Sequence, residues 1–395
     1  MSEYTRGSAL GASGASELFQ LLRDGKPRTR AQLALETGLA RSTITTRVDE
    51  LMDRGLILPV AEAASTGGRP PSQFALNPQA RVVLAADLGA SHATVAITDL
   101  AGTVLAEHNE PLDITAGPIP ILSWLVETAH ALLQRLSLSE SDLVAIGIGV
   151  PGPVHFDTGQ PVNPPIMPGW DRFDIPGWIR QHLAVPVLVD NDVNIMALGE
   201  RATHFPNVEN FILIKVATGI GAGIISNSRL QRGAQGIAGD IGHIRVSRGG
   251  DILCHCGNRG CLEALASGPA VARTLREAGV EALTSTDVID LVKSGNLDAI
   301  GAVRQAGRDL GEVLSTCVSL MNPSVIAIGG SMARAGEHLL AGVREVVYSR
   351  SMPLATEHLH IVPSTSAARA GVLGASALAV HRALSPAGIE ALVRR

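Results

Sequence analysis

The sequence contains few cysteines, few aromatic residues and very little lysine. Of 395 residues, four are cysteine and 3% are aromatic, and only three of the 32 basic residues are lysine. No stretch has eighteen uninterrupted apolar residues, so no membrane span is expected. The first residues also lack the basic start and apolar run of a signal peptide. These absences favour a cytoplasmic protein with reduced thiols, whose core is built from small aliphatic side chains.

Three of the four cysteines lie within eight positions. They are Cys254, Cys256 and Cys261 in the segment CHCGNRGC, and His243 lies eleven residues before the first of them. A disulfide framework would need paired cysteines in an oxidising compartment. In a reducing compartment this spacing predicts a Cys3His zinc site with closed tetrahedral coordination. The alternative is three free thiols in a glycine-rich loop. Cys317, in an apolar run, is expected in the core.

The charge balance does not mark the whole chain as nucleic-acid-binding. The net charge is −5, but residues 1–80 carry nine basic and eight acidic residues. Any contact with DNA must therefore be made by a local surface. The length indicates two or three domains.

The first eighty residues predict three short helices. The first covers residues 16–23, the second runs from an N-cap at Thr29 to Gly38, and the third runs from an N-cap at Ser42 to Gly55. Two helices joined by a short turn form a helix-turn-helix arrangement, whose second helix enters the major groove of DNA. The polar residues available there for bases and phosphates are Arg41, Ser42, Thr43, Thr45, Thr46 and Arg47.

Two short apolar segments follow, on either side of the sequence STGGRP. They predict a β-hairpin, or wing, whose flexible tip carries Arg69. Turn, recognition helix and wing in this order predict a DNA-binding winged helix, which we expect to fold on its own core. The alternative is a three-helix packing module that binds no DNA.

From about Val82 the pattern changes to buried strands. A strand, a glycine turn and a second strand are followed by a turn and a third strand, and a similar unit returns at FILIKVATGIGAGIISNSRLQRG. This repetition suggests a duplicated fold of two lobes that face a cleft. Glycine turns of this kind can present backbone N–H groups to phosphate oxygens.

Two polar residues directly follow the buried strand VPVLVD. They are Asn191 and Asp192, and a carboxylate at this end of a strand points into the ligand crevice. Asp192 could also be the N-cap of the next helix. Asp190 and Asp192 point in alternate directions, so we expect at most one of them to face the cleft.

The chain resembles the ROK (repressor, open reading frame, kinase) family, in its branch of transcriptional repressors. The resemblance rests on STGGRP, DLG, VPGPV, VDNDVN, ATGIGAGI, GDIGH and CHCGNRGCLE. It implies an α/β fold in which a winged helix-turn-helix precedes two actin/hexokinase-like lobes around a sugar and, in the kinases, ATP. The expected domains are residues 1–80 for the winged helix, 81–190 for the first lobe and 191–395 for the second lobe with the zinc loop. A C-terminal helix is free to return to the first lobe.

The resemblance also implies roles for single residues. His243 and the three clustered cysteines match the zinc ligands. Asn191 and Asp192 match a sugar-binding pair, in which the aspartate is the general base of the kinases. The full implied sugar site is Asn191, Asp192, Asp240, His243 and Glu263, with Asp240 in a place where the family usually has glutamate.

Two functions are compatible with these residues. The first is a sugar-responsive transcriptional regulator, acting as a repressor of carbohydrate genes. The second is a sugar kinase that uses ATP and Mg²⁺ and carries an appended DNA-binding module. Ala90 and Ala217 in the glycine turns favour the first, because a side chain stands where backbone should approach phosphate. A zinc hydrolase is disfavoured, since four protein ligands leave no open position on the metal.

The expected partners are DNA and a small molecule. One helix-turn-helix reads a half-site, so we expect a homodimer or homotetramer on a palindromic operator. The small-molecule effector is expected to be a sugar or a sugar phosphate. No interaction with a membrane is expected.

Overall fold

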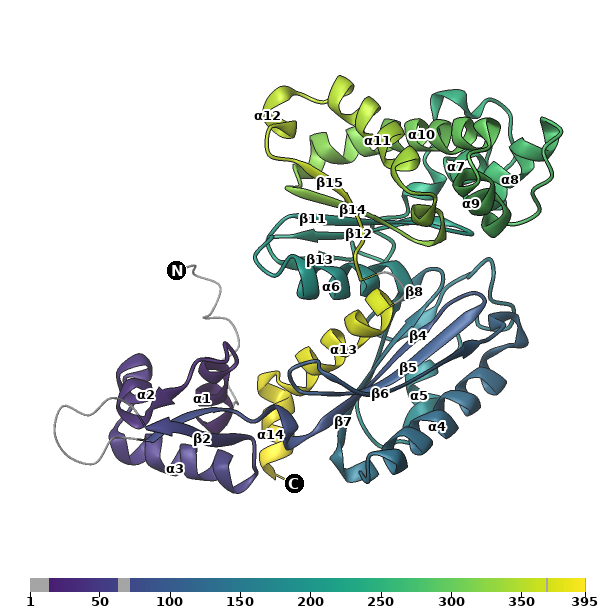
Figure 1. Cartoon of the computed structure of the whole chain (residues 1–395). Coiled ribbons are helices and arrows are strands. Elements are labelled where there is room, and N and C mark those ends of the chain that lie inside the picture. Colours follow the sequence, from purple (N-terminus) through teal and green to yellow (C-terminus); the bar gives the residue numbers. More distant parts are fainter. Residues whose placement is uncertain (1–13, 63–71, 367–368, 395) are drawn as a thin grey trace.

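The computed structural model describes residues 14–62, 72–366 and 369–394, which form a winged helix and two α/β lobes (Figure 1). Arg69 and the rest of the predicted wing tip lie outside the described residues. The winged helix occupies the lower left of Figure 1, the first lobe lies beside it, and the second lobe lies above.

The winged helix has three helices and a small sheet. Its elements are α1 (Gly14–Leu22), β1 (Arg28–Thr29), α2 (Arg30–Thr37), α3 (Arg41–Asp53), β2 (Ile57–Glu62) and β3 (Ser72–Leu76), and the strand order is β1-β3-β2. Thr29 caps α2, as predicted: its side chain accepts a hydrogen bond from the backbone of Gln32, whose side chain bonds back in a capping box. Gly38 ends this helix with a positive φ of 71°.

The predicted N-cap of α3 is wrong. The capping position is Ala40, which makes no side-chain cap, and Ser42 already lies in the first turn. Burial of Ile44 and Val48 fixes where this helix begins, because packing of an apolar face outweighs the preference for a polar cap.

The first lobe is built on a five-stranded sheet of order β10-β7-β4-β5-β6. Its strands are β4 (Val82–Leu88), β5 (His92–Asp99), β6 (Val104–Pro111), β7 (Leu143–Val150) and β10 (Val187–Asn191). The first three form an antiparallel meander, and β7 and β10 add to it in parallel. Helices α4 (Pro118–Arg135) and α5 (Ile175–Arg180) share a core with the sheet. A two-stranded ribbon of β8 (Val154–His155) and β9 (Gln160–Pro161) follows β7.

The second lobe repeats this plan. Its sheet has the order β13-β12-β11-β14-β15, with an antiparallel meander of the first three strands in sequence and two parallel additions. The strands are β11 (Phe211–Val216), β12 (Ile220–Ser226), β13 (Arg229–Gln231), β14 (Val325–Gly329) and β15 (His360–Pro363). The helices are α7 (Glu263–Ala266), α8 (Gly268–Glu277), α9 (Ser285–Lys293), α10 (Leu297–Met321), α11 (Glu337–Arg350) and α12 (Pro353–Thr356). The duplication predicted from the two strand–glycine turn–strand units is therefore seen as two sheets of the same plan.

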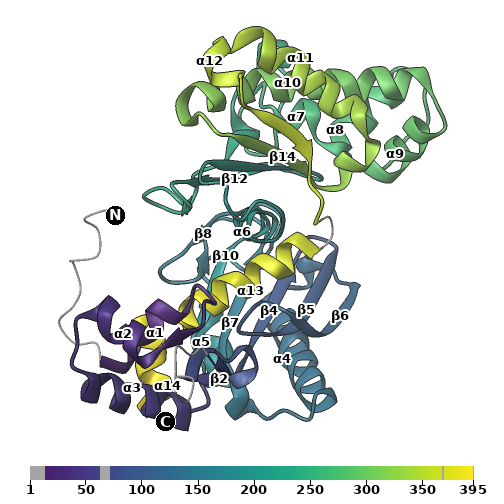
Figure 2. The same cartoon turned by 60° about the vertical axis from the view of Figure 1, so that its left-hand side comes forward.

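Two crossing helices join the lobes. They are α6 (Asp192–His204), which packs on the second sheet, and α13 (Ala370–Ala383), which packs on the first (Figure 2). Their backbones touch at Gly199 and Gly374: a Cβ placed on Gly374 would lie 1.6 Å from the carbonyl oxygen of Ile195. Glycine is required here because of this close approach.

The winged helix does not have a core of its own. Helix α14 (Pro386–Arg394) follows α13 and lies beside the winged helix in both ribbon views. One buried cluster contains Leu18 of α1, Leu392 of α14, and Val83 and Val144 of the first sheet. The expectation of an independent core is thus wrong, because apolar faces of α1 and the C-terminal helices bury one another. Cys317 lies partly buried against the core of the second lobe.

No single helix of the described segments is long and apolar enough to cross a membrane. The pair α13 and α14 passes that test by length and composition, with a bend of 66° between the two helices.

Candidate functional site

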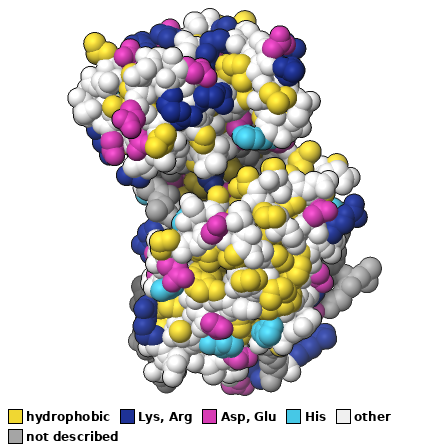
Figure 3. Space-filling model, turned by 90° about the vertical axis from the view of Figure 1, so that its right-hand side faces the viewer, with side chains coloured by type: hydrophobic (Ala, Val, Ile, Leu, Met, Phe, Trp, Pro, Cys, Tyr) yellow, Lys and Arg dark blue, Asp and Glu magenta, His cyan; other side chains and the backbone are white. Residues whose placement is uncertain are grey.

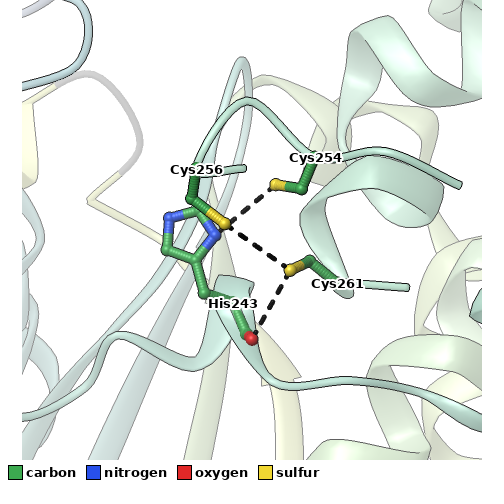
Figure 4. Close-up of side chains that lie close together, drawn as sticks. All are labelled: His243, Cys254, Cys256 and Cys261. Atoms are coloured by element: carbon green, nitrogen blue, oxygen red, sulfur yellow. Dashed lines mark hydrogen bonds between the residues drawn. The ribbon is translucent and has the colours of Figure 1, made fainter. Parts of the chain in front are cut away.

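The clustered cysteines and His243 come together in the second lobe. Their potential ligand atoms all lie within 4.8 Å of one another (Figure 4). The Sγ of Cys254 is 3.6 Å from Nδ1 of His243, and the Sγ atoms of Cys256 and Cys261 are 3.8 Å apart. Zinc at about 2.3 Å from each sulfur would place two sulfurs about 3.8 Å apart in a tetrahedron. The donor set therefore fits a tetrahedral zinc ion.

The loop that carries the cysteines is held at its start and by a hydrogen bond within it. Within it, the N–H of Cys254 donates to the carbonyl of Asn258 at 2.8 Å. At its start, Arg248 forms a 2.5 Å ion pair with the buried carboxylate of Asp309 on α10, and Ser247 donates its N–H to Glu312 on the same helix. These contacts hold the loop against α10.

Two of the thiols are held in their protonated form when no metal is bound. Burial raises the pKa of Cys261 to about 12 and raises that of Cys254 above its ordinary value. The backbone N–H of Asn258 lowers the pKa of Cys256. Binding of a cation would therefore release protons from the buried thiols.

Asn191 organises the junction between β10 and α6. Its side-chain oxygen accepts hydrogen bonds from the N–H groups of Val193 and Asn194, and its Nδ2 donates to the carbonyl of Gly152 at 2.9 Å. Asn191 is thus the N-cap, and the alternative that Asp192 caps this helix is wrong. The cap leaves the carboxylate of Asp192 available for other contacts.

Asp190 and Asp192 point to different partners. Asp190 is buried and accepts from Nε of Arg232 at 2.7 Å and from Nδ2 of Asn194 at 2.8 Å. The guanidinium of Arg232 in turn stacks over the ring of Phe156. Asp190 therefore belongs to a closed structural network.

Asp192 is paired with Lys215. Its Oδ2 accepts a hydrogen bond of 2.5 Å from the ammonium, and the two side chains are 8% and 21% exposed. Sequence reasoning missed Lys215. The available signal was a single charged residue in the otherwise apolar strand FILIKV, because an isolated buried charge needs a partner.

The first glycine turn holds a second buried carboxylate and an imidazole. Burial raises the pKa of Asp87 to about 7, while Lys215 lowers it and Asp192 raises it. Nε2 of His92 lies 4.0 Å from Oδ2 of Asp87. A Cβ on Gly89 would lie 2.2 Å from the ring of His92, so the imidazole packs directly on the turn. Burial lowers the pKa of His92.

Glu263 ties the end of the cysteine loop to β12. Its Oε2 accepts from the N–H of Ile220 at 3.0 Å. Nε2 of His243 lies 3.9 Å from Oδ1 of Asp240, whose side chain is half exposed. His243 thus turns Nδ1 to the sulfurs and Nε2 towards a carboxylate that is open to solvent.

The two groups of predicted sugar residues meet at the start of β12. Glu263 contacts Ile220, and the side chain of Val193, next to Asp192, lies against Gly221. The space-filling view shows the molecule hollowed between its two lobes (Figure 3). The structure therefore places Asp192 and Glu263 on elements that line the same junction.

The predicted DNA-binding residues of α3 divide into two sets. Arg41, Ser42, Thr45 and Thr46 are exposed and Thr43 is half-buried. The side chain of Arg47 is 21% exposed, with its guanidinium 3.8 Å from Glu17 of α1. Arg47 therefore packs α3 against α1, while the other five residues remain accessible.

Sequence profiles of known families match both parts of this architecture. The profile described as ROK family matches residues 83–382, and that described as winged helix-turn-helix DNA-binding matches residues 18–57. The chain belongs to the ROK family. It lies in the branch that carries an N-terminal winged helix-turn-helix, so the predicted family and fold class are confirmed.

Individual ROK proteins match to different extents. The xylose repressor of Bacillus spizizenii is 30% identical over 368 residues, which cover 93% of this chain and 94% of the repressor. A glucokinase of Halalkalibacterium halodurans is 30% identical over 303 residues, covering 73% of this chain and 92% of the kinase. A crystal structure of a ROK family transcriptional regulator, a homologue of the Escherichia coli MLC protein, has a TM-score of 0.81 at 28% identity and covers 96% of this chain and 98% of its own.

Proposed function

We propose that this ROK chain is a sugar-responsive transcriptional repressor of carbohydrate genes that acts in the cytoplasm. The observation that carries the proposal is the single core shared by the winged helix, α14 and the first lobe. A movement of the sugar-binding lobes can reach the DNA-binding helix through this core. The similarity to the xylose repressor along 93% of the chain supports the same function.

Operator contacts come from the exposed start of α3. Arg41 and the hydroxyl of Ser42 are placed to bond base edges and phosphates. The hydroxyls of Thr45 and Thr46 donate to carbonyls of their own helix, so their oxygens are available as acceptors. Arg47 holds α3 on α1 rather than reading bases. Arg69 supplies a wing contact. The chain acts as a homodimer or homotetramer on a palindrome.

The effector is a sugar held between the lobes. The carboxylates of Asp192 and Asp240 accept its hydroxyl hydrogens, and His243 offers Nε2. Asn191 and Glu263 position these groups, since both are engaged with backbone N–H groups. Zinc on His243, Cys254, Cys256 and Cys261 has a structural role: it fixes the loop and the direction of the imidazole.

The alternative function is a sugar kinase, which the similarity to the glucokinase favours. Asp192 would then have to accept a proton from a sugar hydroxyl while a nucleotide is held in line. The ion pair with Lys215 and the imidazole on the first glycine turn both oppose this role. An assay of sugar phosphorylation with ATP and Mg²⁺ separates the two functions.

The repressor function is tested by selection of DNA. The full chain, incubated with a random duplex library, should enrich a palindrome, and one member of a panel of sugars and sugar phosphates should change its retention. Failure to enrich any sequence contradicts the proposal.

A matched pair of variants tests the DNA contact. Arg41→Ala should weaken binding of the selected operator by about 1–3 kcal/mol, because one base or phosphate contact is lost. Arg54→Ala removes an exposed arginine at the opposite end of the same helix and should leave affinity nearly unchanged. Fluorescence anisotropy with a labelled operator measures both. Equal losses would show that α3 does not present its start to DNA.

A further inference from the structure

Lys215 is a charged residue in the interior of the second sheet. It lies in β11 between two buried neighbours, Ile214 and Val216, and pairs across the sheet with Gly221 and Gly329. Its ammonium bonds to Asp192 at 2.5 Å. An ammonium in such a place is stable only when it is matched by negative charge.

Two carboxylates act electrostatically on this ammonium. Asp192 belongs to α6, and Asp87 belongs to β4 of the other lobe; the side chain of each is 8% exposed. Burial alone would lower the pKa of Lys215, but the charges of Asp192 and Asp87 outweigh it and raise the pKa. Lys215 therefore keeps its proton throughout the neutral range.

In a cleft that phosphorylates a sugar, one carboxylate accepts the proton of the sugar hydroxyl. Carboxylates also hold the divalent cation that accompanies the nucleotide. Mg²⁺ prefers carboxylate and phosphate oxygens. Here the oxygen of Asp192 already bonds to a fixed cation. A second, divalent cation at the same carboxylates would be repelled by the ammonium at close range.

The remaining charges favour an uncharged ligand. Besides Asp87 and Asp192, the half-exposed Asp240 and the carboxylate of Glu263 belong to the proposed sugar site. Arg232 does not balance them, because it is paired with Asp190. Asp87 holds a proton for part of the time at neutral pH, because its pKa is raised to about 7, but the ammonium still stands against the carboxylates of Asp192, Asp240 and Glu263. This balance disfavours a phosphate group and leaves hydrogen-bond acceptors for hydroxyls.

We propose that Lys215 is a specificity-determining residue that serves as the resident cation of Asp192 and Asp87, and so commits the cleft to an uncharged sugar without a divalent cation. The inference rests on the proposed sugar-binding role of the cleft. The ammonium of Lys215 then decides whether the cleft only binds a sugar or also phosphorylates it.

Manganese binding tests the cation part. Free Mn²⁺ is measured by electron paramagnetic resonance in the presence of the zinc-loaded full chain. Lys215→Met should bind Mn²⁺ at least about tenfold more tightly than the wild type, because the competing charge is gone. Lys293→Met, which removes an exposed lysine of α9, should behave like the wild type. Equal affinity of wild type and Lys215→Met overturns the proposal.

Two further variants keep the test valid if Lys215→Met folds poorly. Lys215→Arg retains a cation and should exclude Mn²⁺ as the wild type does. The double variant Asp192→Asn with Lys215→Met removes both members of the pair and should bind no more Mn²⁺ than the wild type. Tight binding by either variant contradicts the assignment.

Matched ligand pairs test the uncharged-sugar part. Melting temperatures of the wild type are compared with D-glucose and glucose 6-phosphate, with N-acetylglucosamine and its 6-phosphate, and with D-xylose. An uncharged member should give the larger increase; stabilisation by the phosphates alone overturns this part. Operator selection by the same protein is measured in parallel. A chain that selects no operator contradicts the proposed function, whereas the manganese result stands separately.

Discussion

The two lobes share one strand plan, and they differ in charge at one equivalent position. Asp87 is the penultimate residue of β4 and Lys215 the penultimate residue of β11. Asp87 pairs in parallel with Gly149 of β7, and Lys215 pairs in parallel with Gly329 of β14. The repeat thus brings an acidic residue, Asp87, from one lobe and a cationic residue, Lys215, from the other to the same cleft. Divergence of a single position in a duplicated fold can change what the cleft binds.

The lobes also differ in what is attached to them. The first lobe shares its core with the winged helix, whereas the second lobe carries the loop of His243 and the three cysteines. On the proposed function, a signal from a sugar between the lobes reaches the winged helix through the first lobe, to which α6 and α13 join the second lobe. Substitutions in the metal loop, at the crossing of α6 and α13, and in α14 disturb this path at successive points.

The largest expected effect is on the metal loop of the second lobe. Cys261→Ser should reduce bound zinc from about one per chain to nearly none, because a tetrahedral site loses one of four ligands and a hydroxyl replaces a thiolate. Metal analysis after a chelator wash measures this. The matched control is Cys317→Ser, outside the cluster, which should retain zinc. Retention of one zinc by Cys261→Ser would falsify the ligand assignment.

The crossing of α6 and α13 between the lobes should be nearly as sensitive to substitution. Gly374→Ala should lower the free energy of unfolding by about 3 kcal/mol or more, because the new Cβ meets the backbone of Ile195 and the crossing helices must separate. Gly301→Ala lies in α10 with no atom within 4 Å of its Cβ and should stabilise by about 0.5–1 kcal/mol. Denaturant titration compares them. An unaffected Gly374→Ala would show that the helices are not fixed by this contact.

The charge difference between the lobes should appear in the pH dependence of stability. Burial and the neighbouring Asp192 raise the pKa of Asp87 to about 7, although Lys215 opposes them. A raised pKa means that the folded state holds the proton of Asp87 more tightly than the unfolded chain does. The protonated carboxyl group therefore contributes its full stability below the ordinary pKa of an aspartate, and this stability is lost as the pH rises through about 7.

Asp87→Asn should remove this loss. Relative to the wild type, its free energy of unfolding should improve between pH 4 and pH 7 by up to about 1.4 kcal/mol per pH unit. His92 also faces Asp87, so His92→Gln serves as the control that should keep most of the wild-type slope. Denaturant titrations at several pH values measure the slopes. Identical slopes in wild type and Asp87→Asn would contradict a raised pKa.

Local signals predicted much of this fold. The Thr29 cap and the Gly38 turn depend on neighbouring residues alone, and the two meanders follow from alternating strands and glycine turns. The cysteine spacing predicted the cluster because all four residues belong to one loop and its approach.

Contacts between distant segments could not be predicted in the same way. The pairing of Asp192 with Lys215 joins residues from two elements, and the sequence of neither segment indicates the other as its partner. The inward direction of Arg47 depends on where α1 packs. The start of α3 at Arg41 reflects burial of its apolar face rather than the capping preference of Ser42. In each case tertiary packing outweighed a local preference.

The smallest expected effect comes from the core that joins the first lobe to the winged helix. Leu392 of α14 is 4% exposed in this core. Leu392→Ala should cost about 2 kcal/mol, the lower end for a buried leucine, because it lies in the last turn of its helix and the neighbours can relax. Leu354→Ala, in α12 and 84% exposed, should cost little.

The Leu392→Ala substitution also tests whether α14 transmits the state of the lobes to the winged helix. If it does, Leu392→Ala should weaken operator binding and reduce its response to sugar, although neither the DNA-binding surface nor the sugar site is changed. Anisotropy with and without sugar, at a temperature where both variants are folded, distinguishes this from simple unfolding. Loss of stability with an unchanged sugar response would assign α14 a packing role alone.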